Sequence, residues 1–225
     1  MKRLKRNYNR SYARTVPSKQ SDGKTFLIVV EGKQTERLYF DEFRKRLELK
    51  AADVVIEHAG ATDPQNMVTT AVTLRDKRAE AAKKSVLLAP YDEVWVVFDR
   101  EATHHVRGKQ LPAAISKAAE EEISVALSNP SFEFWLLLHY VFTTKPFSDA
   151  QAVIRELKKH IPKYKKRLFP LDELFALLRT AIKNASACLA HHKAAQGDGN
   201  PSTEAHLLVT SLNNSAAPVF RLISL

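Results

Sequence analysis

Short runs of consecutive apolar residues alternate along the chain with longer segments in which apolar residues recur at helical spacing. The strongest run, Thr25–Val30, is followed at once by a carboxylate and a glycine. A second strong run, Val94–Phe98, ends on acidic residues. Uninterrupted apolar runs of this length are typical of strands buried on both faces of a parallel sheet. Weaker runs predict two further strands, over residues 54–56 and 123–127.

The segments between these strands predict helices over residues 35–49, 64–84 and 111–121, and a very apolar helix begins after Pro130. Strands that alternate with helices of this length indicate βαβ units and a parallel sheet. The expected fold class is therefore α/β, with a mostly parallel four-stranded sheet flanked by helices.

After Thr143 the apolar period becomes helical throughout, and residues 148–160, 171–191 and 202–212 predict helices separated by breaks that contain proline. We expect this half to be a helical C-terminal elaboration that packs on the sheet. The expected organisation is a basic N-terminal arm (1–24), an α/β core (25–145) and a helical C-terminal part (146–225).

Composition is that of a globular protein: 44% of the 225 residues are hydrophobic and 27% are charged. The single cysteine, Cys188, excludes an internal disulfide and a cysteine-based zinc site. No apolar run approaches the roughly 20 residues that span a bilayer, so no membrane association is expected. The basic N-terminus lacks a following apolar core, so it does not resemble a secretory signal. The expected location is the cytoplasm.

The formal net charge of +10 is unevenly distributed. Residues 1–24 carry eight Lys or Arg against one acid, and a second basic cluster covers residues 155–167. Clustered positive charge favours polyanions such as nucleic acid. The alternative is a solubilising arm together with a solvated helix face. The candidate nucleic-acid contacts are Lys2, Arg3, Lys5, Arg6, Arg10, Arg14, Lys158, Lys159, Lys163, Lys165, Lys166 and Arg167.

Three of the predicted strands end in polar residues. Glu31 follows the first, Asp99 and Glu101 follow the third, and Ser128-Asn129 follows the fourth. Because the carboxyl ends of parallel strands lie along one edge of a sheet, these residues are expected to converge there. Asp99 and Glu101 are alternate residues, so on an extended segment both side chains point the same way. The sequence therefore predicts an acidic site at this edge.

Carboxylate-rich sites suit Mg²⁺ or Mn²⁺ better than zinc. Glu36 and Glu133, each in the first turn of a predicted helix, are candidates to extend the acidic cluster. The alternative for any of these acids is a solvated turn residue or a favourable position near a helix N-terminus. Lys33, just past the glycine, is a candidate contact for a phosphate group or is an ordinary solvated lysine.

Two motifs together resemble a known signature. VVEGKQTE followed by VVFDRE resembles the Toprim pattern, a strand-end Glu-Gly and a later strand-end D-x-D, with Glu101 here in place of the second aspartate. More narrowly, IVVEGKQTERLYF, DEVWVVFDRE, SNPSFEFWLLLHY and NPSTEAHLLV occur in order and resemble the RloB-like family. That family is associated with restriction-modification neighbourhoods and abortive infection in prokaryotes. The resemblance covers most of residues 25–212.

The resemblance implies a Toprim-type α/β core and a metal-dependent nuclease. It makes Glu31 a metal ligand or general acid/base, and it makes Asp99 and Glu101 the metal-binding pair. His139 is expected to be a buried structural histidine. The positions that match the family pattern without an assigned role are Glu36, Asn129, Glu133 and His139.

The expected function is Mg²⁺-dependent (or Mn²⁺-dependent) hydrolysis of phosphodiester bonds in RNA, including tRNA, or in DNA, as part of anti-phage defence. The glycine after Glu31 lies in no G-x-x-x-x-G-K-[ST] pattern, so a separate ATPase is a candidate partner. The alternative is a non-catalytic nucleic-acid-binding or regulatory Toprim module that works with such a partner. A primase-like or strand-passing enzyme is disfavoured, because no tyrosine-bearing cleavage domain is recognisable.

Overall fold

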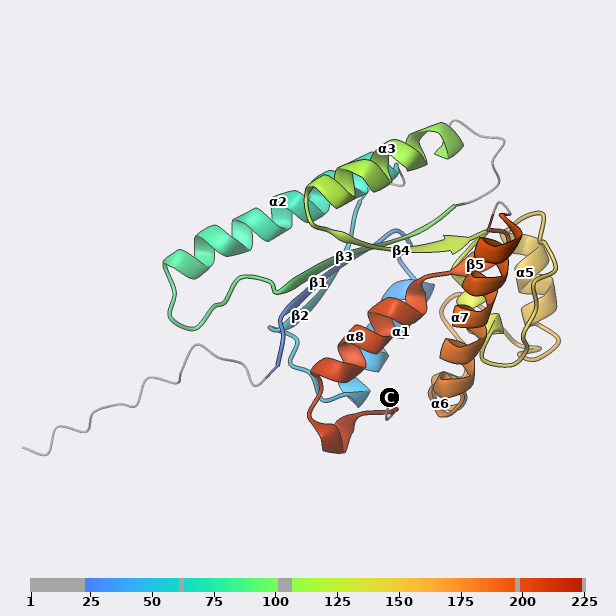
Figure 1. Ribbon diagram of the computed structural model, residues 1–225. Helices are drawn as coiled ribbons and strands as arrows, with labels where there is room; N and C mark the ends of the chain where they lie inside the picture. The colour runs from blue at the N-terminus through green and yellow to red at the C-terminus, as the bar shows by residue number, and fades with distance from the viewer. Residues whose placement is uncertain (1–22, 61–62, 101–106, 197–198, 224–225) are drawn as a thin grey trace, which may run out of the picture.

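The computed structural model describes residues 23–60, 63–100, 107–196 and 199–223 (Figure 1). The basic arm predicted as a nucleic-acid contact, with Lys2, Arg3, Lys5, Arg6, Arg10 and Arg14, lies outside these residues.

A mixed sheet lies at the centre of the described chain. Its strands are arranged in the order β2-β1-β3-β4-β5. The first four pair in parallel, as predicted, and the last pairs antiparallel with β4. The α/β class is therefore confirmed, and the expected four strands are extended by a fifth. The strands are β1 (Phe26–Val30), β2 (Val54–His58), β3 (Glu93–Asp99), β4 (Ser124–Asn129) and β5 (Ser202–Thr203).

Helices cover both faces of this sheet. In Figure 1, α2 and α3 lie on one face and α1 and α8 lie on the other. α5 and α7 lie beside β5, and α6 lies at the lower end of α7. The helices are α1 (Thr35–Arg46), α2 (Pro64–Lys83), α3 (Arg107–Glu120), α4 (Glu133–Leu137), α5 (Ala150–Leu157), α6 (Leu171–Ala176), α7 (Leu178–Ala195) and α8 (Ala205–Ser215), with a 3₁₀ turn, η1, at Pro218–Phe220.

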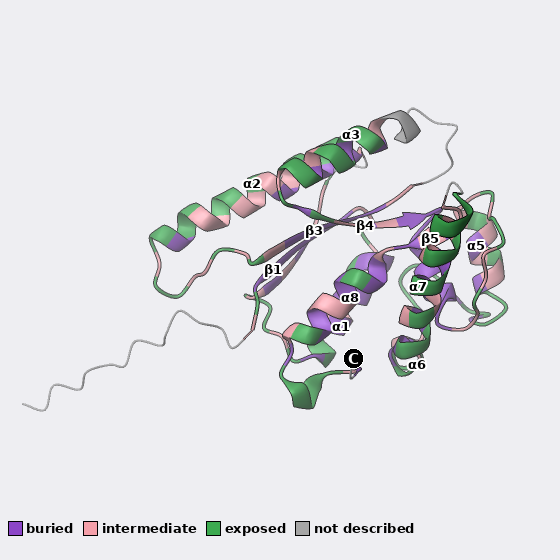
Figure 2. Ribbon diagram, in the orientation of Figure 1, coloured by how far each residue is buried: buried purple, intermediate pink, exposed green. Residues whose placement is uncertain are grey.

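The central strand β1 explains the two-sided core. All five of its residues are fully buried. Successive side chains of a strand point to opposite faces. Accordingly, Phe26 and Ile28 join the cluster under α1 and the C-terminal helices, whereas Leu27 and Val29 join the cluster under α2 and α3. Figure 2 shows the buried strands between helices whose outer faces are exposed.

Three predicted elements differ from the structure. The apolar stretch after Pro130 forms only the short helix α4, because residues 131–139 are buried on every side and their apolarity reflects burial rather than helix length. The predicted helix over 171–191 is divided at Leu177 into α6 and α7. The predicted helix over 202–212 begins later, since its first two residues form β5.

The C-terminal part packs directly on the sheet. Leu178, Ala185 and Leu208 belong to the same apolar cluster as Phe26 of β1. The boundary near residue 145 stays a prediction. Among the helices of the described residues, none has the length and apolar character needed to cross a membrane.

Candidate active site

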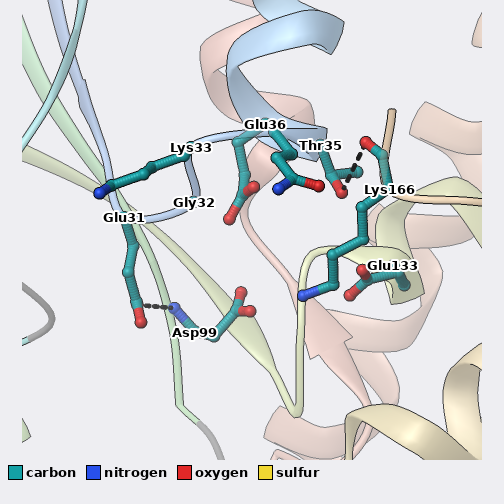
Figure 3. Close-up of a pocket in the computed structure, with 9 residues that line it drawn as sticks. Glu31, Gly32, Lys33, Thr35, Glu36, Asp99, Glu133 and Lys166 are labelled. Atoms are coloured by element: carbon teal, nitrogen blue, oxygen red, sulfur yellow. Dashed lines mark hydrogen bonds between the residues drawn. The ribbon is translucent and has the colours of Figure 1, made fainter. Parts of the chain in front are cut away.

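A cavity of about 250 Å³ lies at the carboxyl ends of β1 and β3, beside the N-terminus of α1 (Figure 3). It brings together five of the six residues predicted to be catalytic. The sixth, Glu101, lies outside the described residues. The residues that line this cavity, called here the acidic cavity, are Glu31, Gly32, Lys33, Gln34, Thr35, Glu36, Asp99, Glu133 and Lys166.

Strand pairing brings the first two acids together. Val30 is level with Val97 in the parallel register, so Glu31 and Asp99 leave neighbouring strands at nearly the same height. The Glu31 side chain is fixed there, because its Oε2 accepts a hydrogen bond of 3.2 Å from the backbone N–H of Asp99 (Figure 3). The convergence predicted from the topology is therefore present for this pair.

Glu36, in the first turn of α1, adds a third acid to the cavity. Its side chain is buried, with 7% of the residue exposed. The pKa of Glu36 is raised to about 7, chiefly by burial and then by the nearby carboxylates of Glu133 and Glu31, while a backbone hydrogen bond and Lys166 oppose the rise. The acidic cavity therefore concentrates negative charge that its own residues neutralise only in part.

Gly32 makes room for this glutamate. A Cβ atom at position 32 would lie 2.5 Å from Cδ of Glu36, so the Glu36 carboxyl group occupies the space of the missing side chain. Gly32 lies in the turn between β1 and α1. The structure gives space as the reason for glycine, because Gly32 is not among the residues with a positive φ.

Glu133 approaches from the other side, at the start of α4. It is buried, and two hydroxyl groups hold its carboxylate: Ser131 Oγ donates to Oε2 at 2.8 Å, and Tyr164 OH donates to Oε1 at 3.0 Å. Burial, and next the Glu133 charge, raise the pKa of Tyr164, so its hydroxyl remains a donor. Glu133 is thereby fixed in an orientation that the sequence did not predict.

Lys166 enters the acidic cavity from the C-terminal part. It lies on a tight turn in which Lys165 and Leu168 exchange backbone hydrogen bonds of 3.0 and 2.8 Å. Thr35 Oγ1 donates to the Lys166 carbonyl at 3.4 Å and so connects the turn to α1. In Figure 3 the Lys166 side chain extends toward Glu133 and Asp99, whereas Lys33 points away from them.

The acidic cavity fits a hard divalent cation in its chemistry. Its carboxylate oxygens are the ligands that Mg²⁺ and Mn²⁺ prefer. A cation would also relieve the repulsion between the buried acids. Within the described residues, no group of three His, Cys, Asp or Glu side chains is placed to hold an ion. Glu31 and Asp99 supply two of the three predicted ligands, and Glu101 is the third.

The other predicted residues lie away from the acidic cavity. Asn129, at the end of β4, is buried and pairs with Ser202. His139 is a buried structural residue, as expected: its Nδ1–H donates to the Trp135 carbonyl at 3.0 Å, and burial lowers its pKa to about 4. The predicted nucleic-acid contacts that are exposed and do not line the acidic cavity are Lys158, Lys159, Lys163, Lys165 and Arg167.

Sequence reasoning missed how Thr35, Tyr164 and Ser131 support the site, and it placed Lys166 only in a general basic cluster. Tyr164 and Thr35 are 129 residues apart in the chain. The motif SNPSFEF did contain a signal for Ser131, because a hydroxyl two residues before a buried glutamate can bond it. No local sequence pattern indicated that Thr35 and Tyr164 support the site.

This fold and cavity define an α/β protein with a carboxylate-lined site at the carboxyl edge of a mostly parallel sheet. The family model described as RloB-like protein matches residues 26–212. The match covers most of the chain, so the chain belongs to the RloB-like family. No curated protein and no solved structure matched the chain.

Proposed function

We propose that this chain is a metal-dependent nuclease that hydrolyses phosphodiester bonds in RNA, including tRNA, or in DNA. One observation carries the proposal. Four carboxyl groups and Lys166, contributed by four separate segments, line one cavity at the carboxyl edge of the sheet. Hard oxygen ligands beside a lysine suit a phosphate diester, because both the metal and the ammonium group compensate phosphate charge.

Glu31, Asp99 and Glu101 would hold the metal. A bound divalent cation would polarise the scissile phosphate and lower the pKa of an attacking water. The hydrogen bond from the Asp99 N–H holds the Glu31 carboxylate in place at the sheet edge. Such preorganisation is a main source of catalytic advantage in charged sites.

The remaining residues of the acidic cavity act on the substrate side. Lys166 supplies an ammonium group toward the phosphate oxygens. Glu133, held by Ser131 and Tyr164, and Glu36, held over Gly32, bound the space in which the phosphate and the water would lie. Their fixed positions would orient the nucleophile rather than bind the nucleic acid.

The biological setting follows from the family. The RloB-like resemblance implies a role in prokaryotic anti-phage defence, and the absence of a Walker motif from the sequence favours a separate ATPase as activator. We therefore expect hydrolysis to depend on a partner encoded nearby. Adding the purified partner and ATP to the cleavage assay described next would reveal this dependence.

The test is a cleavage assay with end-labelled tRNA, single-stranded RNA and duplex DNA, in Mg²⁺, Mn²⁺ or EDTA. With the purified partner and ATP present, wild-type protein should cleave at least one substrate in metal and none in EDTA. Glu31→Gln and Asp99→Asn should each lower kcat by about 100-fold or more, because each removes a metal ligand. Glu120→Gln, at an exposed acid at the end of α3, is the matched control.

Cleavage by both variants at the wild-type rate would show that the site is misassigned. No cleavage of any substrate, with or without the partner ATPase, would refute the nuclease proposal itself. Far-ultraviolet circular dichroism would confirm that each variant is folded.

One observation favours a second candidate function, a non-catalytic nucleic-acid-binding or regulatory module. Glu101 stands where the Toprim pattern has its second aspartate, and its longer side chain changes where that carboxylate lies. Such a module would bind nucleic acid equally well in EDTA and in Mg²⁺, and would support the activity of its partner without hydrolysis. Binding without cleavage in the same assay would favour it.

A further inference from the structure

A second cavity of about 350 Å³ opens beside the acidic cavity. Lys33 and Gln34 line both, so the two spaces lie next to each other at the N-terminus of α1. The residues that line this second space, called here the flanking groove, are Lys33, Gln34, Arg37, Leu38, Asp41 and Arg167.

The flanking groove and the acidic cavity differ in charge. The groove contains three basic residues and one acid, Asp41, whereas four acids line the cavity. Asp41 is shared between two arginines, at 4.0 Å from Arg37 and 3.6 Å from Arg44. The Arg37 side chain is 49% exposed and so remains accessible from solvent. A positive groove therefore borders the negative cavity.

The turn at residues 165–168 serves both spaces. Lys166 lines the acidic cavity, and the next residue, Arg167, lines the flanking groove. The turn is held against the core, because Tyr164 bonds to Glu133 and Thr35 bonds to the Lys166 carbonyl. Two consecutive cations are thus presented to two adjacent sites from one supported turn.

We infer that the flanking groove binds the phosphate next to the scissile one, with Arg37 and Arg167 as its contacts. This inference rests on the proposed nuclease function and specifies how the strand lies. A guanidinium group matches a phosphate with two parallel hydrogen bonds. The N-terminal end of the 12-residue helix α1 adds a favourable dipole. The strand therefore passes from the groove, over Lys33 and Gln34, into the acidic cavity.

This path divides the basic cluster predicted from the sequence. Arg167 contacts the strand beside the site, whereas Lys158 and Lys163 line neither space. Arg37, which no sequence pattern identified, takes part instead. Contacts of this kind position the backbone and read no bases, so the groove gives affinity without sequence preference.

The test measures binding of fluorescently labelled single-stranded RNA and DNA by the full chain in EDTA, where metal-dependent cleavage does not occur. Arg37→Gln and Arg167→Gln should each weaken binding about fivefold to tenfold and reduce the salt dependence by about one phosphate contact. Lys183→Gln removes an equal charge from an exposed position on α7 that lines neither space, and it should bind within about twofold of wild type.

A second readout separates substrate contact from general electrostatics. In metal, Arg37→Gln and Arg167→Gln should raise KM with kcat nearly unchanged, because the adjacent phosphate is bound equally in ground and transition states. Unchanged thermal unfolding midpoints would confirm that both variants are intact.

Two outcomes would overturn the inference while leaving the nuclease intact. In the first, wild-type protein cleaves, but both arginine variants bind as Lys183→Gln does. In the second, Lys183→Gln weakens binding as strongly as they do. If wild-type protein neither binds nor cleaves nucleic acid, the proposed function fails, and the inference fails with it.

Discussion

Gly32 and Glu36 show how one residue at the sheet edge determines the position of another. The Glu36 carboxyl group fills the volume that a side chain at position 32 would need. The strand-to-helix turn therefore holds a carboxylate directly above its own backbone. In the segment EGKQTE, the glycine is small because the glutamate four residues later occupies the space beside it. The pattern of apolar residues gives no sign of this contact.

Replacing Gly32 with alanine should displace the Glu36 carboxyl group, because the new Cβ would overlap it. Since small displacements of catalytic groups are costly, we expect cleavage to fall by about 10- to 100-fold while the fold is retained. The assay is single-turnover cleavage by Gly32→Ala. Adding Glu36→Asp, whose shorter side chain leaves room for the Cβ, should recover part of the loss. Wild-type activity in Gly32→Ala would contradict this account of the glycine.

The buried acid Glu36 should also make stability depend on pH. Because its pKa in the folded protein is raised to about 7, the folded state retains a proton that the unfolded state has released. The stability that the folded protein gains from holding this proton is fully present below the usual carboxyl pKa and is lost as the pH rises through 7. The loss amounts to about 3 kcal/mol at most.

Glu36→Gln stays neutral at every pH, so its stability relative to wild type should increase between pH 5 and pH 8. Urea denaturation in EDTA at the two pH values measures this difference. The exposed control Glu120→Gln should show no such increase. If Glu36→Gln and wild type differed in stability by the same amount at pH 5 and pH 8, ionisation of Glu36 would not destabilise the folded protein.

At the scale of elements, the apolar runs predicted the parallel strands well. Strands buried on both faces have a distinctive uninterrupted pattern, and β1 and β3 have it. β5 was missed because its two residues, Ser202 and Thr203, carry no apolar signal and pair only with the edge of β4. The length of α4 was overestimated because a segment buried on all sides has no helical period.

The Tyr164 hydroxyl is one of the groups that hold the turn carrying Lys166 in place. Tyr164→Phe keeps the ring that packs against Phe169 but removes the hydrogen bond to Glu133. We expect a loss of about 1 kcal/mol in the free energy of unfolding, the usual value for one buried hydrogen bond. Cleavage should fall more than stability suggests, since both Glu133 and Lys166 lose their support. Urea denaturation and the cleavage assay together measure this, and unchanged cleavage would show that the turn is positioned by other contacts.

At the scale of the whole molecule, topology made part of the site predictable. Glu31 and Asp99 follow neighbouring parallel strands, so a sequence that predicts the strands also predicts that these acids meet. Lys166, Tyr164 and Arg37 were not predictable in their roles. Their positions depend on how residues 161–170 pack against α1, which is a tertiary contact between segments with no shared local pattern.

The C-terminal part therefore has two functions in this account. It completes the apolar core under β1, and it brings a basic turn to the edge where the core presents its acids. The core contributes the four acids and Lys33 to the acidic cavity, and the C-terminal part contributes Lys166. The acids and the turn form one functional unit despite the predicted boundary near residue 145.

The most direct test of the central claim is a crystal of the full chain soaked in Mn²⁺, with anomalous diffraction used to locate the ion. We expect an anomalous peak in the acidic cavity between the carboxylates of Glu31 and Asp99, and we expect Asp99→Asn to lose it. Mn²⁺ should also support cleavage by the same wild-type protein. A peak elsewhere, no peak, or a peak that survives in Asp99→Asn would contradict the central claim.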